Sequence, residues 1–386
     1  MDQTRARWLH GALLLCLTAG CAADPQPQAG VEAGKSADYA LAGPHPVGHV
    51  DFTSIDAARK RSLRLTLWYP AAASAAAAAK LGTPLADFAS PGAERDALTP
   101  LLAKAPPGCT RQTLGSALAA PPLLGKPWPL VLFSHCHGCT RFSSAALAER
   151  LASHGIAVLA VDHAGNTLYD ALAGKLGGLD AQTLQTRVAD VRHALDLALD
   201  PTAAAVPEAV RGRLDAGQVG ALGHSFGGVT AARLAQTDPR VKAVAAIAVP
   251  MQNPLLPGVD LQALYLPLLF VLAQEDNSIG EAGNFLILKN FADANPPAWL
   301  IEVATAGHFS FFDLAGLVPA FAAGCGEGKS MADDEPFTYL DNAVARGIGQ
   351  RVVTGFFAAH LRGELTGLGA LEAEVPAGTV FVSVRN

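Results

Sequence analysis

The sequence Gly-His-Ser-Phe-Gly at residues 223–227 is the strongest indication of the fold of this chain. An apolar run at 219–222 comes before it and a helix-compatible stretch at 229–236 comes after it, so the motif joins a strand to a helix. A G-x-S-x-G sequence in this setting is typical of a nucleophile elbow, a sharp turn that lifts the serine hydroxyl off the end of the sheet. Glycine suits the flanking positions because a side chain there would clash. An ordinary glycine-rich turn is the alternative, but the strand and helix around the motif favour Ser225 as a nucleophile.

Apolar segments of strand length alternate with helical patterns on both sides of the motif. The continuous apolar runs at 129–133 and 156–161 are typical of parallel strands that are buried on both faces. Residues 144–154 between them have apolar side chains at helical spacing. The alternation continues through 188–199, 219–222, 229–236, 241–249, 266–273, 299–303 and 343–361. We therefore predict an α/β fold with a mostly parallel, doubly wound sheet.

Four further segments complete the predicted architecture. The alternating residues 64–68 predict an early strand of an antiparallel pair. The alanine-rich run at 71–79 predicts either a short helix or an insertion in a surface loop. Residues 82–126 carry many prolines and predict loops and short helices that cover one face of the sheet. Residues 379–383 predict a strand near the C-terminus.

The composition limits the class of protein. The chain has 386 residues, half of them apolar, which suits one large core, so we expect a single folded domain at 43–386 rather than two domains. The formal net charge is −6 and no cluster of lysine and arginine is present, which argues against a nucleic-acid partner. These properties leave the oligomeric state open.

The N-terminal segment predicts export. Arg5 and Arg7 precede an apolar stretch at 9–17 that is too short to span a bilayer, so we interpret residues 1–20 as a signal peptide. Small residues directly before Cys21 resemble a bacterial lipoprotein signal, in which this cysteine carries the lipid, and a plain secretory signal is the alternative. The polar, proline-rich residues 21–42 predict a flexible spacer between the lipid and the domain.

Lipidation of Cys21 predicts a membrane-anchored protein of the cell envelope. Ala22 follows it in place of aspartate, which favours the outer membrane and the periplasm. Export also implies an oxidising compartment, in which four cysteines of the domain can form two disulfides with three possible connectivities. These cysteines are Cys109, Cys136, Cys139 and Cys325.

A histidine base is the next requirement, because a serine hydroxyl is a weak nucleophile at neutral pH. In proteins with a nucleophile elbow, an acid and then a histidine follow the serine along the chain. His308 lies just beyond the predicted strand at 299–303, where a loop can present its imidazole to Ser225. The other downstream histidine, His360, falls in the predicted closing helix. We therefore predict that His308 is the base.

The predicted acid is Asp276, whose carboxylate would hold the tautomer of the histidine. It follows the predicted strand at 266–273, which is a usual position for this group. Glu275 beside it and Asp260 are alternatives, and capping of the next helix is the structural alternative for Asp276 itself.

Acyl transfer also needs two N–H donors for the oxygen that becomes negative. The backbone N–H of Phe226, directly after the serine, is the predicted first donor, and the second comes from the loop at 134–141. This loop holds two histidines and two cysteines within five residues, which also suggests a metal site. The crowding and the lack of a second cluster favour a disulfide through Cys136 or Cys139, so we expect no metal.

Several stretches together carry a family resemblance over most of the predicted domain. They are residues 46–48, 68–70, 133–135 with Arg141, 151–155, 162–167, 223–228 and 307–311. The chain resembles a bacterial lipoprotein branch of the α/β-hydrolases, similar to platelet-activating-factor acetylhydrolases and dienelactone-hydrolase-like esterases. The resemblance implies the α/β-hydrolase fold and no organic cofactor. It also implies that the backbone N–H of His137 is the second oxyanion donor.

Two positions depart from the pattern of that family. Cys136 stands where glycine usually follows the histidine of the oxyanion loop, which alters the loop or ties it by a disulfide. Ser225 stands where true dienelactone hydrolases have cysteine, so the lactone activity does not carry over. Asp162 and His163 close a strand beside the expected pocket, and we interpret them first as structural supports.

These patterns and the resemblance predict an exported serine carboxylester hydrolase, similar to platelet-activating-factor acetylhydrolase, that acts on a small-molecule or lipid-like ester. Cleavage of polymeric or aromatic esters in a cutinase-like manner is the alternative within the esterases. A catalytically silent binding protein of the envelope is the alternative from another class. The set of Ser225, Asp276 and His308 argues against the silent protein.

Overall fold

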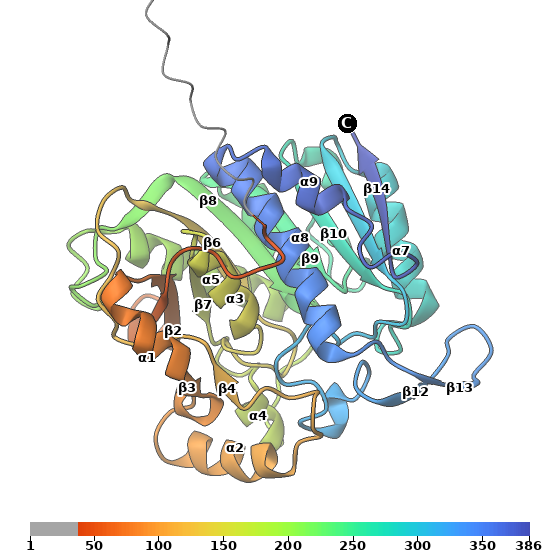
Figure 1. Cartoon of the computed structure of the whole chain (residues 1–386), viewed down its shortest axis with the longest axis horizontal. Helices are drawn as coiled ribbons and strands as arrows, with labels where there is room; N and C mark the ends of the chain where they lie inside the picture. The colour runs from red at the N-terminus through yellow and green to blue at the C-terminus, as the bar shows by residue number, and fades with distance from the viewer. Residues whose placement is uncertain (1–37) are drawn as a thin grey trace, which may run out of the picture. The chain divides into compact units, whose positions relative to one another are not determined.

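A ten-stranded sheet is the centre of the computed structural model, which describes residues 38–386 (Figure 1). The strands lie in the order β14-β11-β10-β9-β8-β6-β7-β2-β1-β5. They are β1 (Val47–Asp56), β2 (Arg61–Pro70), β5 (Ala117–Leu118), β6 (Trp128–Ser134), β7 (Ala157–Val161), β8 (Leu214–His224), β9 (Val241–Ile247), β10 (Leu268–Ala273), β11 (Ala298–Val303) and β14 (Val380–Arg385).

The pairing confirms the predicted mostly parallel sheet. From β7 through β6, β8, β9 and β10 to β11, each strand is parallel to its neighbour. Antiparallel strands flank this block, with β2 beside β7 and β14 beside β11. The strand β2 also pairs antiparallel with β1, as the alternation at 64–68 predicted. The parallel block is buried on both faces, and this explains its continuous apolar runs.

Helices cover both faces of the sheet, because alternate side chains of a strand point to opposite faces. Val131 and Phe133 of β6 belong to one hydrophobic cluster, whereas Leu130 and Leu132 belong to another. The helices of the first cluster are α3 (Ala145–Ser153) and α8 (Asn342–Arg362), and those of the second are α5 (Ala181–Leu199), α6 (Phe226–Thr237) and α7 (Gly280–Asp293). The arrangement confirms the doubly wound fold.

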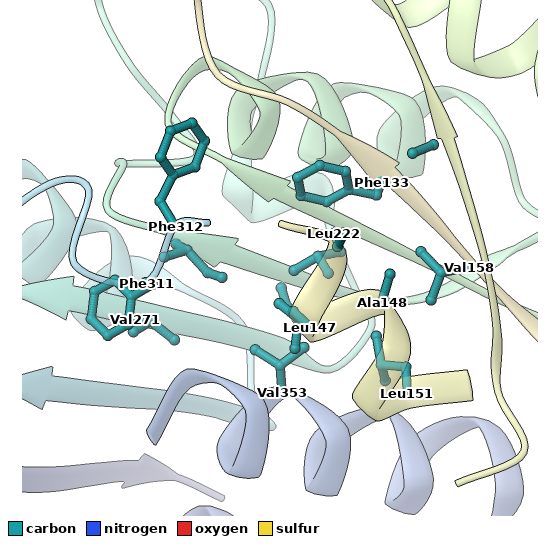
Figure 2. Close-up of a cluster of buried hydrophobic side chains, with 14 of the residues drawn as sticks. Phe133, Leu147, Ala148, Leu151, Val158, Leu222, Val271, Phe311, Phe312 and Val353 are labelled. Atoms are coloured by element: carbon teal, nitrogen blue, oxygen red, sulfur yellow. The ribbon is translucent and has the colours of Figure 1, made fainter. Parts of the chain in front are cut away.

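The first cluster joins the sheet to the loop that contains His308. Figure 2 shows Leu147 of α3, Val353 of α8 and Leu222 of β8 in this cluster, together with Phe311 and Phe312, which follow His308 in sequence. All five side chains are buried. The apolar face predicted for the closing helix is therefore the face that α8 packs on the sheet.

Short elements between β2 and β6 form the predicted cover. They are α1 (Ala76–Leu81), α2 (Ala93–Lys104), the pair β3 (Thr83–Pro84) and β4 (Thr113–Leu114), and 3-10 turns at Ala73–Ala75 and Leu85–Phe88. The alanine-rich run is thus helical from Ala76, the first of its two alternatives. The remaining elements are α4 (Leu168–Leu172), α9 (Thr366–Glu372), 3-10 turns at Leu261–Ala263 and Pro319–Phe321, and the hairpin β12 (Glu327–Lys329) with β13 (Pro336–Thr338).

The packed part of the chain begins before the predicted boundary at residue 43. The ring of Tyr39 is buried, and its hydroxyl donates a hydrogen bond of 2.8 Å to Glu364. Burial of an aromatic ring stabilises its segment on the domain, and composition alone did not reveal this contact. The predicted signal peptide and Cys21 lie outside the described residues. None of the helices within 38–386 is both long and apolar enough to cross a membrane.

Two disulfides settle the cysteine connectivity. Cys109 is bonded to Cys325, and Cys136 is bonded to Cys139. The first bond ties the cover to the loop after His308, across 216 residues of sequence. The second closes a short loop after β6.

Candidate active site

Ser225 occupies a backbone conformation that side chains rarely adopt. Its φ is 54° and its ψ is −129°, at the junction of β8 and α6. Strain of this kind costs about 1–3 kcal/mol and persists only where the surrounding structure enforces it. A Cβ at Gly223 would collide with the carbonyl of Gly227, and one at Gly227 would collide with the carbonyl of Ser134. The two glycines of the motif therefore allow the strained turn.

The elbow and the loop after β6 each open to solvent at a single residue. Ser225 is the only residue of 219–232 that is not buried, and His137 is the only such residue of 128–149. The rings of His137 and Phe226 lie 6.3 Å apart between centroids. Since Phe226 follows Ser225 directly, the two accessible points belong to one region.

His308 and Asp276 come together as the sequence predicted. The Nδ1 atom of His308 donates to a carboxylate oxygen of Asp276 at 2.7 Å, and both side chains are buried. The other carboxylate oxygen accepts the backbone N–H groups of Ser278 and Ile279, each at 3.1 Å. Parallel strands β10 and β11 precede the two loops, so both loops leave the same edge of the sheet. The carboxylate is thus fixed, and it orients the imidazole.

The alternative acids and the other histidine have different contacts. Glu275 accepts the backbone N–H of Met331 at 2.7 Å. Asp260 caps the 3-10 turn Leu261–Ala263. His360 belongs to α8, and its ring centroid lies 5.1 Å from that of Trp299 in β11. None of these side chains has a hydrogen bond to His308 in the described part of the chain.

His224, the residue before the nucleophile, was not singled out from sequence. Its Nε2 donates to the backbone carbonyl of His308 at 2.8 Å, so the elbow holds the loop of the proposed base beside Ser225. Burial lowers the pKa of His224 to about 3, so the ring is neutral at neutral pH. His224 therefore places no positive charge beside His308. The signal for this residue was only its position inside the motif.

Two backbone N–H groups, one on the elbow and one on the loop at 134–141, have no hydrogen-bond partner among the described residues. They belong to Phe226 and His137. The disulfide between Cys136 and Cys139 brackets His137. Backbone N–H groups without an acceptor are what the predicted oxyanion site requires.

The histidines and cysteines of this loop are already engaged with protein groups. His135 donates from Nδ1 to the carbonyl of Cys136 at 2.7 Å and accepts at Nε2 from the backbone N–H of His163 at 3.1 Å. Burial lowers its pKa well below the usual range. Within the described residues, no group of three metal-ligating side chains is present. The loop is therefore a hydrogen-bonded and disulfide-closed turn.

Asp162 and His163 form hydrogen bonds that hold the loop at 134–141, as their predicted structural role requires. Asp162 accepts from the backbone N–H and the guanidinium of Arg141, each at 2.7 Å. His163 contacts Ser134 at 3.0 Å and Asp190 at 3.2 Å. Burial lowers the pKa of His163 to about 4, so it is a neutral link between the loop and α5.

Family models match two overlapping parts of the chain. A model described as platelet-activating factor acetylhydrolase, isoform II, matches residues 32–171. A model described as serine aminopeptidase, S33, matches residues 125–274. The second stretch contains the elbow, and the first contains the loop at 134–141.

Individual proteins give a similar result. A platelet-activating factor acetylhydrolase of Cavia porcellus is 26% identical over 231 residues, which are 50% of each chain. The chain thus spans about half the length of this relative. The cutinase est2 of Thermobifida alba is 36% identical over 104 residues, 27% of this chain and 29% of the cutinase. A solved ferulic acid esterase from Streptomyces cinnamoneus has a TM-score of 0.60 and 24% identity, over 83% of this chain and 92% of that one, which demonstrates a shared fold.

The disulfide that brackets His137 gives a testable prediction. Replacing Cys136 and Cys139 together by serine removes the closure of the loop and lets the His137 N–H turn away. We expect kcat for p-nitrophenyl acetate to fall about tenfold to a hundredfold, less than the 10²–10³-fold cost of removing an oxyanion donor outright. The double variant Cys109→Ser and Cys325→Ser is the matched control, and it should lose thermal stability while it keeps most of kcat. An unchanged kcat in the Cys136 and Cys139 variant contradicts this role.

Proposed function

We propose that this chain, which has the α/β-hydrolase fold, is a serine carboxylester hydrolase that forms an acyl-enzyme. The main support for the proposal is the hydrogen bond between His308 and Asp276, in a loop that His224 of the elbow holds by the carbonyl of His308. A histidine in contact with a fixed carboxylate suits it to take the proton of a serine hydroxyl. The relatives named as acetylhydrolases and cutinases support ester hydrolysis.

The proposed reaction has two stages. In the first, Ser225 Oγ attacks the ester carbonyl while His308 Nε2 takes the hydroxyl proton, and the N–H groups of Phe226 and His137 donate to the negative oxygen of the tetrahedral intermediate. His308 then gives the proton to the departing alcohol, which leaves an acyl group on Ser225. In the second stage His308 takes a proton from water, the hydroxide attacks the acyl carbon, and the proton returns to Ser225 as the acid leaves. Asp276 stays ionised throughout and stabilises the imidazolium.

A lipid-like ester with a short acyl group is the proposed substrate, as in the relatives named for platelet-activating factor. The segment after β7 supports an apolar substrate, because Leu172, Leu176 and Leu179 keep 47%, 36% and 49% of their surface exposed. The side chain of Leu176 lies beside Gly138, which follows His137 in the oxyanion loop. Apolar surface next to the donors suits an ester with an apolar part.

The cellular location proposed here is the bacterial envelope, with a lipid at Cys21. The sequence before this cysteine supports the proposal, and two disulfides suit an oxidising compartment. Expression of the full chain and of Cys21→Ser, followed by separation of membrane and soluble fractions, tests it. The wild-type chain should sediment with membranes and Cys21→Ser should not. Equal distribution of the two contradicts lipid anchoring.

Ester hydrolysis is tested with wild-type protein, three single variants of the predicted catalytic residues and one control variant. Ser225→Ala and His308→Ala should each lower kcat for p-nitrophenyl acetate by at least about 10³-fold, since both residues act directly in proton transfer and bond formation. Asp276→Asn should lower kcat by up to about 10⁴-fold, because it leaves the imidazole in the wrong tautomer. Glu275→Gln is the matched control, and its kcat should stay within about threefold of wild type, since its carboxylate binds Met331 instead of His308. Full activity in Ser225→Ala contradicts the mechanism.

The choice of ester is tested with the same protein and a series of p-nitrophenyl esters from acetate to palmitate. The short-acyl proposal predicts that kcat/KM is highest for acetate and falls as the chain lengthens. Polyester film and a feruloyl ester test the cutinase-like alternative. Faster turnover of either one than of the acetate ester contradicts the short-acyl proposal. Absence of turnover on every ester would instead favour the silent binding protein.

A further inference from the structure

We propose that Arg187 is a positioning residue. Together with Asn166, it fixes the position of the two proposed oxyanion donors, the N–H groups of Phe226 and His137, relative to each other. The inference rests on the proposed ester hydrolysis and adds residues that neither the motif nor the comparisons assign. Arg187 lies on α5, behind the donors, and it touches both the loop at 134–141 and the elbow helix α6.

Arg187 is an unusual group to find in the interior. Its side chain is fully buried, and no carboxylate of residues 38–386 forms an ion pair with it. Burial lowers its pKa to about 9, although the negative charge of Asp190 opposes this shift, and Arg187 stays charged at neutral pH. A buried charge that has no carboxylate in direct contact is expensive, so its hydrogen bonds must be well made. Arg141, which is equally buried, contrasts with it because it pairs with Asp51 and Asp162.

The contacts of Arg187 fall on both sides of the oxyanion site. On the side of the loop, its guanidinium donates to the carbonyl of His135 and to Ser134 Oγ, the latter at 3.1 Å. On the side of α6, its Nε donates to Thr230 at 3.3 Å, and the guanidinium lies 4.5 Å above the ring of Phe226. Cation–π attraction of this kind fixes the ring that follows the nucleophile. One rigid planar group therefore spaces the loop from the helix.

Asn166 extends this support to the second donor. Its side-chain oxygen accepts from Arg187, so its amide nitrogen faces the other way and donates to His137 Nδ1 at 2.8 Å. Its backbone carbonyl accepts from the N–H of Gly138 at 3.1 Å. The peptides on both sides of Cys136 and His137 are thus held, through His135 and Gly138, while the N–H of His137 itself stays free.

Fixing the two donors should stabilise the transition state more than the bound substrate. A tetrahedral oxyanion binds both N–H groups strongly, whereas the ground-state carbonyl depends on them less. If the two donors lose their relative position, kcat should therefore fall and tetrahedral inhibitors should bind more weakly, with little change in KM. A merely structural role would lower stability without this pattern.

The test compares Arg187→Met, Arg187→Lys and Asn166→Ala with the wild-type protein. We expect Arg187→Met to lower kcat for p-nitrophenyl acetate by about 10- to 100-fold, and Asn166→Ala by about tenfold, each with KM within about threefold of wild type. Arg187→Lys should restore little of kcat, because one ammonium cannot replace a planar fork with several donors. The inhibition constant for phenylboronic acid, which forms a tetrahedral adduct with the serine, should rise in parallel with the loss of kcat.

Arg351→Met is the matched control. Arg351 is also a buried arginine that donates to carbonyl groups, those of Ala370 and Val375, but it joins α8 to α9 and to the segment that follows α9. Its replacement should lower the unfolding temperature and keep kcat. Asn166→Ala keeps the question answerable if Arg187→Met does not fold.

Two outcomes overturn the inference, and they separate it from the proposed function. If the wild-type protein hydrolyses the ester, and Arg187→Met or Asn166→Ala keeps its kcat and its affinity for phenylboronic acid, then Arg187 has only a structural role. If the wild-type protein hydrolyses no ester, the proposed function fails and the inference falls with it. A parallel loss of kcat and of boronate affinity, absent from Arg351→Met, supports the inference.

Discussion

The close approach of Gly227 to the backbone of Ser134 and His135 is the constraint on which the site depends. No Cβ fits at Gly227, so the elbow and the loop after β6 meet backbone to backbone. This contact places the loop that contains His137 against the elbow that contains Ser225 and Phe226, and the rings of His137 and Phe226 lie 6.3 Å apart between centroids. The strained backbone conformation of Ser225 persists because β8, α6 and the neighbouring loop pack around the turn and enforce it.

Two further loops from the carboxyl edge of the sheet are joined to the elbow. The loop after β10 provides Asp276, the loop after β11 provides His308, and His224 at the end of β8 holds the latter loop by the carbonyl of His308. Burial keeps His135, His163 and His224 neutral, so they serve as hydrogen-bonding links without adding charge around the imidazole. The buried cation Arg187 instead contacts the carbonyl of His135 and the ring of Phe226, on the side of the proposed oxyanion.

Local patterns predicted much of this arrangement. The strand lengths and helical spacing predicted the parallel sheet, and the order of serine, acid and histidine predicted the contact between His308 and Asp276. Contacts between distant segments were not readable in the same way. The cysteine pairing depends on which loops meet in space, and Tyr39 belongs to the domain only because Glu364 lies beside it. Arg187 carried no signal, because an arginine in a helical pattern is normally solvent-exposed.

The nucleophilic role of Ser225 is measured directly by identifying the residue that an activated fluorophosphonate modifies. Such a probe is attacked by a serine that has a histidine base and an oxyanion site, and it then remains attached as a stable tetrahedral adduct. Digestion of the labelled protein and mass spectrometry of the peptides locates the adduct. We predict one adduct, on the peptide that contains Ser225. A protein that stays unlabelled, or an adduct on another serine with Ser225 unmodified, would contradict the account.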